Sequence, residues 1–379
     1  MNNIAINNPF IVGKYLSDKY FCDRTEETEF LRKQLQNGRD VALISPRRIG
    51  KSGLIQHFFN QQDIKENYHV LFIDIYATSS LTELVYLLGK AIADQLKPRT
   101  TAWRERFLQV VSSLRVGFKL DAVTGNPTFD IGLGDIQSPE TTLGEIFRYL
   151  EEADRPCIVA IDEFQQVAAY AEQNTEAMLR TYIQQCHQTL FIFSGSKRHM
   201  MTQMFHSPAK PFYQSAIGMT LQPLDRAVYA DFARRLFAQN GRTLADGVAE
   251  HVYDYTEGYT WFMQMLMNEL FALTPSDSTC TSDLIPKAQD NILQAQDGIY
   301  RELMANLSIK QRQLLQAIAR EGRVAGITSS AFIRRHHLSS ASSVQSAARP
   351  LLENDIITQT EGTYRLYDFF LSQWLASVY

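Results

Sequence analysis

The chain has 379 residues, of which 45% are hydrophobic and 21% are charged. This composition is typical of a folded globular protein and excludes a disordered one, and the length predicts two or three domains. A formal net charge of -4 excludes a globally basic nucleic-acid binder, so any basic face must be local.

The cysteines and the N-terminal residues indicate the same cellular compartment. The four cysteines lie far apart without a C-x-x-C spacing, which argues against a zinc site or a disulfide framework. The first residues, MNNIAINNPFIVGKY, lack the basic and apolar segments of a signal peptide. No stretch contains the roughly 18 consecutive apolar residues that a transmembrane helix needs. We therefore expect a cytoplasmic protein without a membrane partner.

Residues 1–221 alternate short apolar runs with segments of helical periodicity. The runs are too apolar on both faces for exposed strands, so they predict the buried strands of a parallel sheet. They are VALIS (41–45), VLFIDIY (70–76), CIVAIDEF (157–164) and LFIFSGS (190–196). The repeated order of strand, helix and strand predicts a doubly wound α/β domain. Residues 116–135 differ, because their apolar positions alternate about a T-G-N-P turn, which predicts an inserted β-hairpin.

The remaining chain changes pattern twice. Residues 222–298 contain amphipathic helical runs separated by glycines, which predict a small helical bundle. Residues 299–379 have the order helix, helix-turn-helix and two strands about Glu361-Gly362, which is typical of a winged helix. We therefore expect three domains, with boundaries near residues 221 and 298.

Residues 45–53, SPRRIGKSG, contain most of a phosphate-binding loop. The full pattern is G-x-x-x-x-G-K-[ST], and Ser45 stands where its first glycine belongs. An apolar strand precedes the loop and a helical segment follows it directly, as a phosphate site at a helix N-terminus requires. We expect Lys51 to contact the β- and γ-phosphates and Ser52 to ligate Mg²⁺, while Gly50 lets the backbone approach the phosphates. The residues expected to bind the nucleotide are Pro46, Arg47, Arg48, Ile49, Gly50, Lys51, Ser52 and Gly53.

Two carboxylates end another buried strand. Asp162 and Glu163 follow the apolar residues IVAI directly. We expect Asp162 to hold Mg²⁺ and Glu163 to polarise the attacking water. Acidic residues also end strands as turn formers or helix caps. The loop and the acidic pair together nevertheless favour ATP and Mg²⁺ as ligands.

With these motifs the chain resembles the archaeal-type ATPases of the STAND class of P-loop NTPases, which are relatives of the AAA+ ATPases. SPRRIGKSGLI is similar to the family's loop G-P-R-R-x-G-K-[ST]-S-L, and IVAIDEFQQV is similar to its apolar run ending in D-E. The resemblance covers nearly the whole chain and implies an ATPase core, a helical lid and a C-terminal winged helix. It also implies that Ser194, in LFIFSGS, senses the γ-phosphate. A serine that only caps the segment after the strand is the alternative.

Three segments depart from the family's pattern. FCDRTEETEFL resembles F-x-G-R-x-x-E-L, which lies near the nucleotide's base in the family, but Asp23 replaces the glycine. A capping box between Asp23 and Glu26 explains the same residues. GYTWFMQML resembles the lid motif, with Tyr259 and Thr260 in place of the usual residues. Relatives often carry an arginine near a Y-G-R sequence, where this chain has Gln214, so an arginine acting in trans is not expected there.

Three functions compete. The first is an ATP-driven switch with slow hydrolysis, in which a lid couples the nucleotide state to the winged helix. The second is a DNA-binding regulator in which ATP is secondary. Residues 300–379 carry nine Lys/Arg and six Asp/Glu, but the helix expected to read DNA carries only Arg349. The third is a kinase, which is disfavoured because Glu163 suits activation of water. We predict the first, with a homo-oligomer and a protein or DNA at the winged helix as partners.

Overall fold

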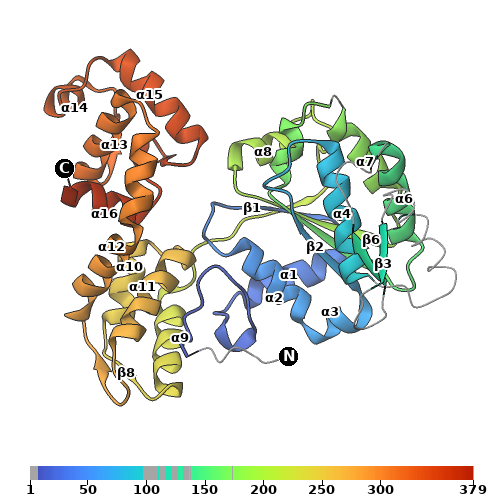
Figure 1. The fold of residues 1–379 in the computed structure, drawn as a ribbon, viewed down its shortest axis with the longest axis horizontal. Helices are drawn as coiled ribbons and strands as arrows, with labels where there is room; N and C mark the ends of the chain where they lie inside the picture. Colours follow the sequence, from blue (N-terminus) through green and yellow to red (C-terminus); the bar gives the residue numbers. More distant parts are fainter. Residues whose placement is uncertain are drawn as a thin grey trace. The chain divides into compact units, whose positions relative to one another are not determined.

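The computed structural model describes residues 7–96, 110, 117–120, 127–130, 136, 138–172 and 174–378 (Figure 1). The chain forms two compact units. One is Gly13–Leu224, and the other is Asp225–Tyr379 together with the N-terminal residues up to Val12. Within the described ranges, no helix is long and apolar enough to cross a membrane. The four cysteines are free.

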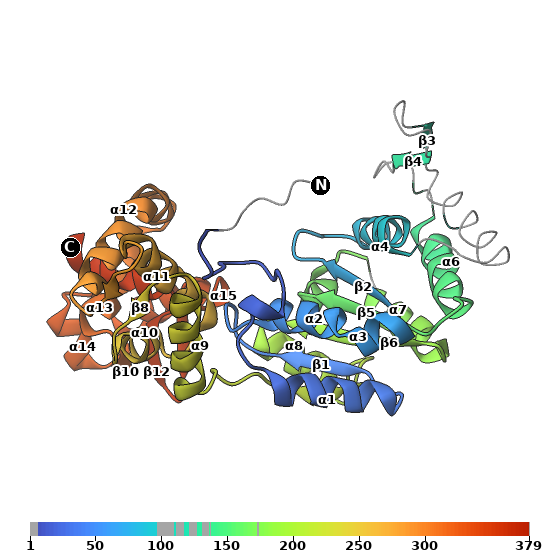
Figure 2. The same cartoon turned by 90° about the horizontal axis from the view of Figure 1, so that it is seen from below.

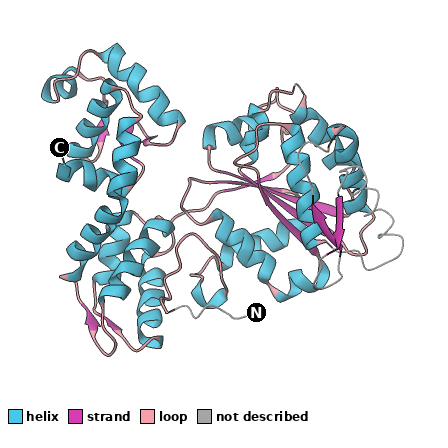
Figure 3. Cartoon of the chain, viewed as in Figure 1, coloured by secondary structure: helices cyan, strands magenta, loops and turns pink. Residues whose placement is uncertain are grey.

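The first unit contains a five-stranded parallel sheet with the strand order β2-β5-β6-β1-β7 (Figure 3). Its strands are β1 (Val41–Ile44), β2 (His69–Asp74), β5 (Cys157–Asp162), β6 (Thr189–Gly195) and β7 (Ile217–Met219). The four strands predicted from apolar runs are confirmed. The edge strand β7 was not predicted, because three residues with a central glycine give no usable apolar pattern.

Helices cover both faces of this sheet. They are α1 (Thr25–Gln36), α2 (Lys51–Asn60), α3 (Gln62–Asn67), α4 (Leu81–Gln95), α6 (Pro139–Glu151), α7 (Thr175–Gln185) and α8 (Arg198–His206), with the 3-10 turns η1 (Asp18–Tyr20) and η3 (Phe164–Ala169). Ala42 and Ile44 of β1 join one core cluster with α4, α6 and α7, while the alternate residues Val41 and Leu43 are buried on the other face. Figure 2 shows α1 and α4 on opposite sides of the strands. The core is therefore a three-layer α/β/α arrangement, which confirms the predicted fold class.

A second small sheet lies in the segment between α4 and α6. Strand β3 (Gly117–Leu120) pairs antiparallel with β4 (Pro127–Asp130), within the range for which the sequence predicts a hairpin. Residues 121–126, which include the T-G-N of the predicted turn, lie outside the described residues, and Pro127 is the first residue of β4.

The second unit begins with four helices. They are α9 (Arg226–Gln239), α10 (Val248–Thr256), α11 (Thr260–Leu273) and α12 (Leu284–Ala305), and a short parallel pair joins β8 (Thr243–Leu244) to β9 (Thr279–Cys280). The N-terminal segment packs on them: the ring centroid of Phe10 lies 5.5 Å from that of Phe237 and 6.1 Å from that of Phe271. Asn8 Nδ2 donates to the carbonyl of Asn268 over 2.8 Å. These contacts explain why the N-terminal residues belong to this unit.

The last part of the chain has the winged-helix order that the sequence predicts. Its helices are α13 (Ile309–Glu321), α14 (Ser330–Arg335), α15 (Ala341–Glu353) and α16 (Phe369–Val378). Strands β11 (Ile357–Thr360) and β12 (Thr363–Leu366) form the wing, and β10 (Val324–Ala325) adds a third antiparallel strand. Helix α12 runs through residue 298 without a break, because its apolar face continues as far as Tyr300 and Met304.

A partly buried carboxylate at the start of β1 gives a test of the core. Asp40 Oδ1 accepts the backbone N–H of Phe191 over 2.8 Å, and burial raises the pKa of Asp40 to about 6. A carboxyl whose pKa is higher in the folded state stabilises the fold below its unfolded pKa, and loses this contribution as the pH rises through the folded value. We therefore expect Asp40→Asn, whose amide oxygen still accepts the Phe191 N–H, to raise stability at pH 7.5 by roughly 1–2 kcal/mol.

The gain should shrink as the pH falls to 4, because Asp40 is then protonated in the folded state and about half protonated in the unfolded state, whose carboxyl has its ordinary pKa near 3.9. Urea unfolding of the wild type and the variant between pH 4 and pH 7.5 measures this difference. A variant that is less stable at pH 7.5, or a difference that does not change with pH, would contradict the prediction.

Candidate functional site

The segment between β1 and α2, where the sequence predicts a phosphate-binding loop, passes through the left-handed region of the backbone just before the helix begins. Gly50 has a φ of 103°, which is easily adopted only by glycine, and α2 begins at the next residue, Lys51. Arg48 also lies in the left-handed region, with a φ of 59°. No side chain caps the N-terminus of α2. The first N–H groups of an α-helix have no partner within the helix, so they can donate to a ligand.

The Lys51 side chain folds back onto this loop. Its Nζ donates to the carbonyl of Ser45 over 3.0 Å and to the carbonyl of Pro46 over 2.9 Å, and only 6% of the residue is exposed. Two neutral carbonyls are a weaker setting for an ammonium than anionic oxygens are. The ammonium of Lys51 thus lies against the loop, beside the N-terminus of α2.

The structure brings the loop to the acidic strand end. Ser52 Oγ donates to Asp162 Oδ2 over 2.5 Å, although the two residues are 110 positions apart. Their proximity follows from the topology: β1 and β5 flank β6 in a parallel sheet, so their carboxyl ends share one edge. Asp162 is 4% exposed.

This pair fits Mg²⁺ in the way that nucleotide-dependent sites usually do. Mg²⁺ binds through one or two protein oxygens and completes its shell with water and phosphate oxygens. A hydroxyl and a carboxylate in contact supply these hard ligands. In the part of the chain that the structure describes, no group of three or more His, Cys, Asp or Glu side chains could hold a metal by itself. Ser52 and Asp162 therefore offer two of the oxygen ligands that Mg²⁺ takes.

Glu163 lies next to this pair and is held by two donors. Its Oε2 accepts from Ser196 Oγ over 2.6 Å and from the side-chain amide of Gln165. Arg47 Nε donates in turn to Ser196 Oγ over 3.3 Å, so a chain of polar contacts connects the loop to Glu163. Glu163 itself has a φ of 56°, which turns the chain sharply after β5.

Sequence reasoning singled out Ser194 in this region and missed Ser196 and Gln165. Ser194 is completely buried, and its Oγ has no hydrogen-bond partner among the described residues. Its role as a γ-phosphate sensor stays a prediction. Ser196 follows two positions later in the same LFIFSGS segment. The polar residues at the end of this strand therefore indicated a site residue there, but did not show which of the two serines it is. Gln165 gave no signal, because its contact with Glu163 depends on the turn between β5 and η3.

A third carboxylate, Asp74, ends the neighbouring strand β2 opposite Asp162 in the ladder. The pKa of Asp74 is raised above its ordinary value, mainly by burial. The hydrogen bond from the backbone N–H of Tyr76 offsets part of this rise, and the negative charges of Asp162 and Glu163 add to it. The Arg47 guanidinium lies over the exposed ring of Tyr76, with its Cζ 5.1 Å from the ring centroid. This edge of the sheet therefore carries three acidic side chains beside one basic loop.

The FCDR segment does not form a capping box. The N-cap of α1 is Arg24, no side chain caps this helix, and Asp23 has a φ of 54°. The capping-box alternative for Asp23 and Glu26 is therefore wrong. The left-handed backbone of Asp23 explains instead why a glycine suits this position, because glycine adopts positive φ without strain.

The residues of the expected lid motif pack on the winged helix within the second unit. The Tyr259 ring lies 6.0 Å from that of Tyr367 and 5.9 Å from that of Phe369. The Arg365 guanidinium lies 5.3 Å from the Tyr259 centroid and pairs with Glu257 over 3.4 Å. The motif thus joins the helices α10 and α11 to the winged helix.

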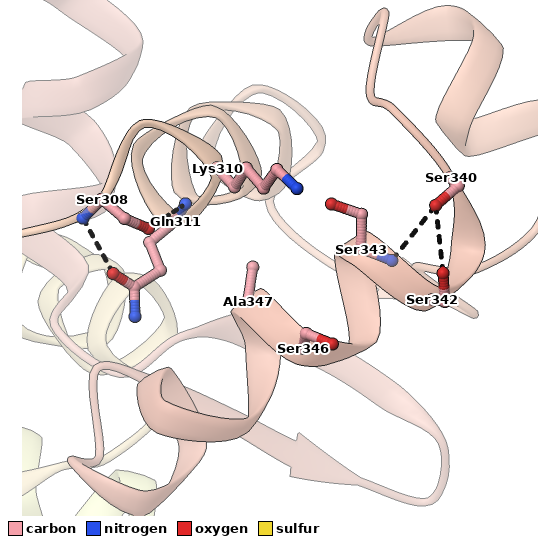
Figure 4. A pocket seen from close by; sticks show the side chains of 8 residues that line it. All are labelled: Ser308, Lys310, Gln311, Ser340, Ser342, Ser343, Ser346 and Ala347. Atoms are coloured by element: carbon pink, nitrogen blue, oxygen red, sulfur yellow. Dashed lines mark hydrogen bonds between the residues drawn. The ribbon is translucent and has the colours of Figure 1, made fainter.

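A polar groove lies between the N-terminal ends of α13 and α15 (Figure 4). It has a volume of about 480 Å³ and is lined by Ser308, Lys310, Gln311, Ser340, Ser342, Ser343, Ser346 and Ala347. The Ser308 and Ser340 hydroxyls already cap their own helices. Lys310 is the only charged residue of the lining, so the groove offers little attraction for a run of phosphates.

The sheet, the loop and the winged helix together define a P-loop ATPase fold of the AAA+-related type. The family model described as an ATPase domain predominantly from Archaea matches residues 21–266, and a model described as a probable winged helix domain matches residues 298–377. The chain belongs to this archaeal-type ATPase family and carries a C-terminal winged helix domain. The resemblance to archaeal-type ATPases with a C-terminal winged helix, drawn from the sequence, is confirmed.

Solved structures share the fold over nearly the whole chain. A Walker-type ATPase of Pyrococcus abyssi has a TM-score of 0.67 and 18% identity, over 97% of this chain and 99% of that one. The ORC2 protein of Aeropyrum pernix, in ADPNP–ADP complexes, has a TM-score of 0.59 and 14% identity over 98% and 96%. The ORC1 protein of Aeropyrum pernix, in complex with DNA, has a TM-score of 0.53 and 10% identity over 94% and 93%. At these identities the likeness shows the fold alone. The comparison with curated proteins gives no match.

Proposed function

We propose that the chain binds ATP with Mg²⁺ at the carboxyl edge of the sheet and hydrolyses the ATP slowly. The observation that carries this proposal is the 2.5 Å bond between Ser52 Oγ and Asp162 Oδ2, which joins the loop to the acidic strand end. The α2 N-terminus supplies N–H donors for phosphate oxygens, and the hydroxyl and carboxylate supply oxygen ligands for Mg²⁺. The ADPNP–ADP complexes of the similarly folded ORC2 protein support a nucleotide as the ligand.

Each residue has a separate role in this proposal. Lys51 directs its ammonium, which has three N–H donors, at the β- and γ-phosphates, because an ammonium binds anionic oxygens more strongly than neutral carbonyls. Loop residues 46–53 surround the phosphates. Ser52 and Asp162 hold Mg²⁺, which when bound neutralises the charge that develops on the transferring phosphoryl group. Glu163 orients the attacking water and takes its proton.

The contacts of Glu163 support a slow reaction. Two hydrogen bonds to Oε2 of Glu163 occupy lone pairs that a water would use. Glu163 becomes a competent base when the donor Ser196 turns away. Ser194, buried two residues earlier, is our candidate for the group that senses the γ-phosphate.

We further propose a STAND-type switch, with residues 222–298 as the lid and 299–379 as the output module. The support comes from the contacts of Tyr259 and Glu257 with Arg365, which tie the lid segment to the winged helix. A hinge movement of one therefore carries the other with it. We favour a protein over duplex DNA as the winged-helix partner, because Arg349 of α15 pairs with Glu353 over 2.9 Å and a DNA reader needs a denser basic face.

ATP turnover by the purified full-length protein tests the proposal. We expect slow release of phosphate that requires Mg²⁺ and is not stimulated by duplex DNA. Absence of ATP binding in calorimetry would overturn the nucleotide site. A stimulation of tenfold or more by duplex DNA, in moderate salt, would replace the protein partner with DNA.

A further inference from the structure

The side-chain amide of Gln165 is buried beside Glu163, at the acidic end of β5. Its Nε2 donates to Glu163 Oε2, which also accepts from Ser196 Oγ over 2.6 Å. Gln165 lies in η3, the turn that follows Glu163, and is 1% exposed. A hydroxyl turns about one bond, whereas a buried glutamine is confined by the side chains packed around it. Gln165 is therefore the more rigid of the two donors to the carboxylate.

Gly195, at the end of β6, leaves the space that this amide occupies. A Cβ on Gly195 would lie 2.5 Å from Gln165 Oε1 and 2.5 Å from the Sδ of Met201, which is closer than such atoms approach in folded proteins. Gly195 is not among the glycines with positive φ, so its backbone does not require glycine. The close approach of the Gln165 and Met201 side chains thus explains a glycine at this strand position.

The other end of the Gln165 amide does not stabilise the fold. Its Oε1 is buried and accepts no hydrogen bond from the residues that the structure describes. A buried carbonyl oxygen without a donor costs free energy, so an apolar side chain of the same length would suit this position better for folding alone. Polar groups kept at such a cost are typical of functional sites, where stability and activity oppose each other. The contact with Glu163 therefore accounts for a glutamine here.

We propose that Gln165 is a positioning residue for ATP hydrolysis, which fixes the direction of the Glu163 carboxylate in the space that Gly195 leaves. This inference rests on the proposed function, because it needs Glu163 to act on the attacking water. In that function Ser196 turns away from Glu163, and Gln165 is the donor that still orients the carboxylate. Without this donor the carboxylate is aligned with the water for less of the time, so hydrolysis slows while the affinity for ATP stays the same.

Single-turnover hydrolysis and calorimetry of the full-length protein, with ATP and Mg²⁺, test the proposal. Gln165→Met keeps the length of the side chain and removes the donor. We expect its rate of hydrolysis to fall by about tenfold to a hundredfold, with an ATP affinity equal to that of the wild type. Its melting temperature should be equal or higher, because the unpaired carbonyl is gone. Gly195→Ala, which retains every polar group of the site, should lower the rate in the same way at unchanged ATP affinity.

Gln166→Met is the matched control, because Gln166 is the next residue of η3 and its amide donates to the carbonyl of Tyr76 instead of to Glu163. We expect its rate to equal that of the wild type. An equal loss of rate in Gln166→Met, or a wild-type rate in Gln165→Met or in folded Gly195→Ala, would overturn the positioning role while the proposed function stands. If the wild type neither binds nor hydrolyses ATP, the proposed function fails and the positioning role fails with it.

Discussion

Lys51→Ala is expected to abolish tight ATP binding. The ammonium of Lys51 donates to the carbonyls of Ser45 and Pro46. It lies at the start of α2, the helix that our proposal places against the phosphates. Charge-assisted bonds contribute about 1.5–3 kcal/mol each, so losing two to the β- and γ-phosphates weakens binding by about a hundredfold or more. Isothermal titration calorimetry with ATP and Mg²⁺ measures this loss.

Lys65→Ala is the matched control, because Lys65 is an exposed lysine of α3 in the same unit. We expect its ATP affinity to equal that of the wild type. Thermal unfolding should show that both variants remain folded. Unchanged ATP affinity in Lys51→Ala would contradict the phosphate-loop assignment itself.

Glu163→Gln is expected to stop hydrolysis and leave binding intact. The amide cannot take a proton from water, but its oxygen still accepts from Ser196 and Gln165, so the turn after β5 keeps its shape. Loss of a general base lowers rates by about a hundredfold or more. Single-turnover assays should therefore show that drop, while calorimetry shows normal affinity for ATP with Mg²⁺.

Asp162→Asn separates metal binding from proton transfer. It weakens the oxygen pair with Ser52, so we expect it to impair binding of Mg²⁺ with ATP as well as turnover. If Glu163→Gln hydrolyses ATP at the wild-type rate, Glu163 is only a strand-end carboxylate and the base lies elsewhere. If the prediction holds, the ATP-loaded variant is the form in which to capture a partner or a homo-oligomer.

The sequence predicted what depends on local pattern. Four long apolar runs specified the central strands, and Gly50-Lys51-Ser52 between a strand and a helix specified the loop. Short strands were not predicted, because β7 has three residues and β10 has two, which are too few to show a periodic pattern. The capping box at Asp23 failed for a related reason: side-chain type does not reveal that the backbone there is left-handed.

The sequence by itself therefore determined the class of protein and the central strands of the core. It also determined the loop at residues 45–53 and the acidic pair Asp162-Glu163, since each of these is encoded in residues adjacent along the chain. Only the tertiary structure decided which side chains meet. Ser52 meets Asp162, Ser196 meets Glu163 and Ser45 meets Leu221, because a parallel sheet gathers the carboxyl ends of distant strands at one edge. Ser45, which departs from the loop pattern in the sequence, accepts the backbone N–H of Leu221 in the fold. Hydrogen bonds between distant residues depend on this packing, and no local spacing records them.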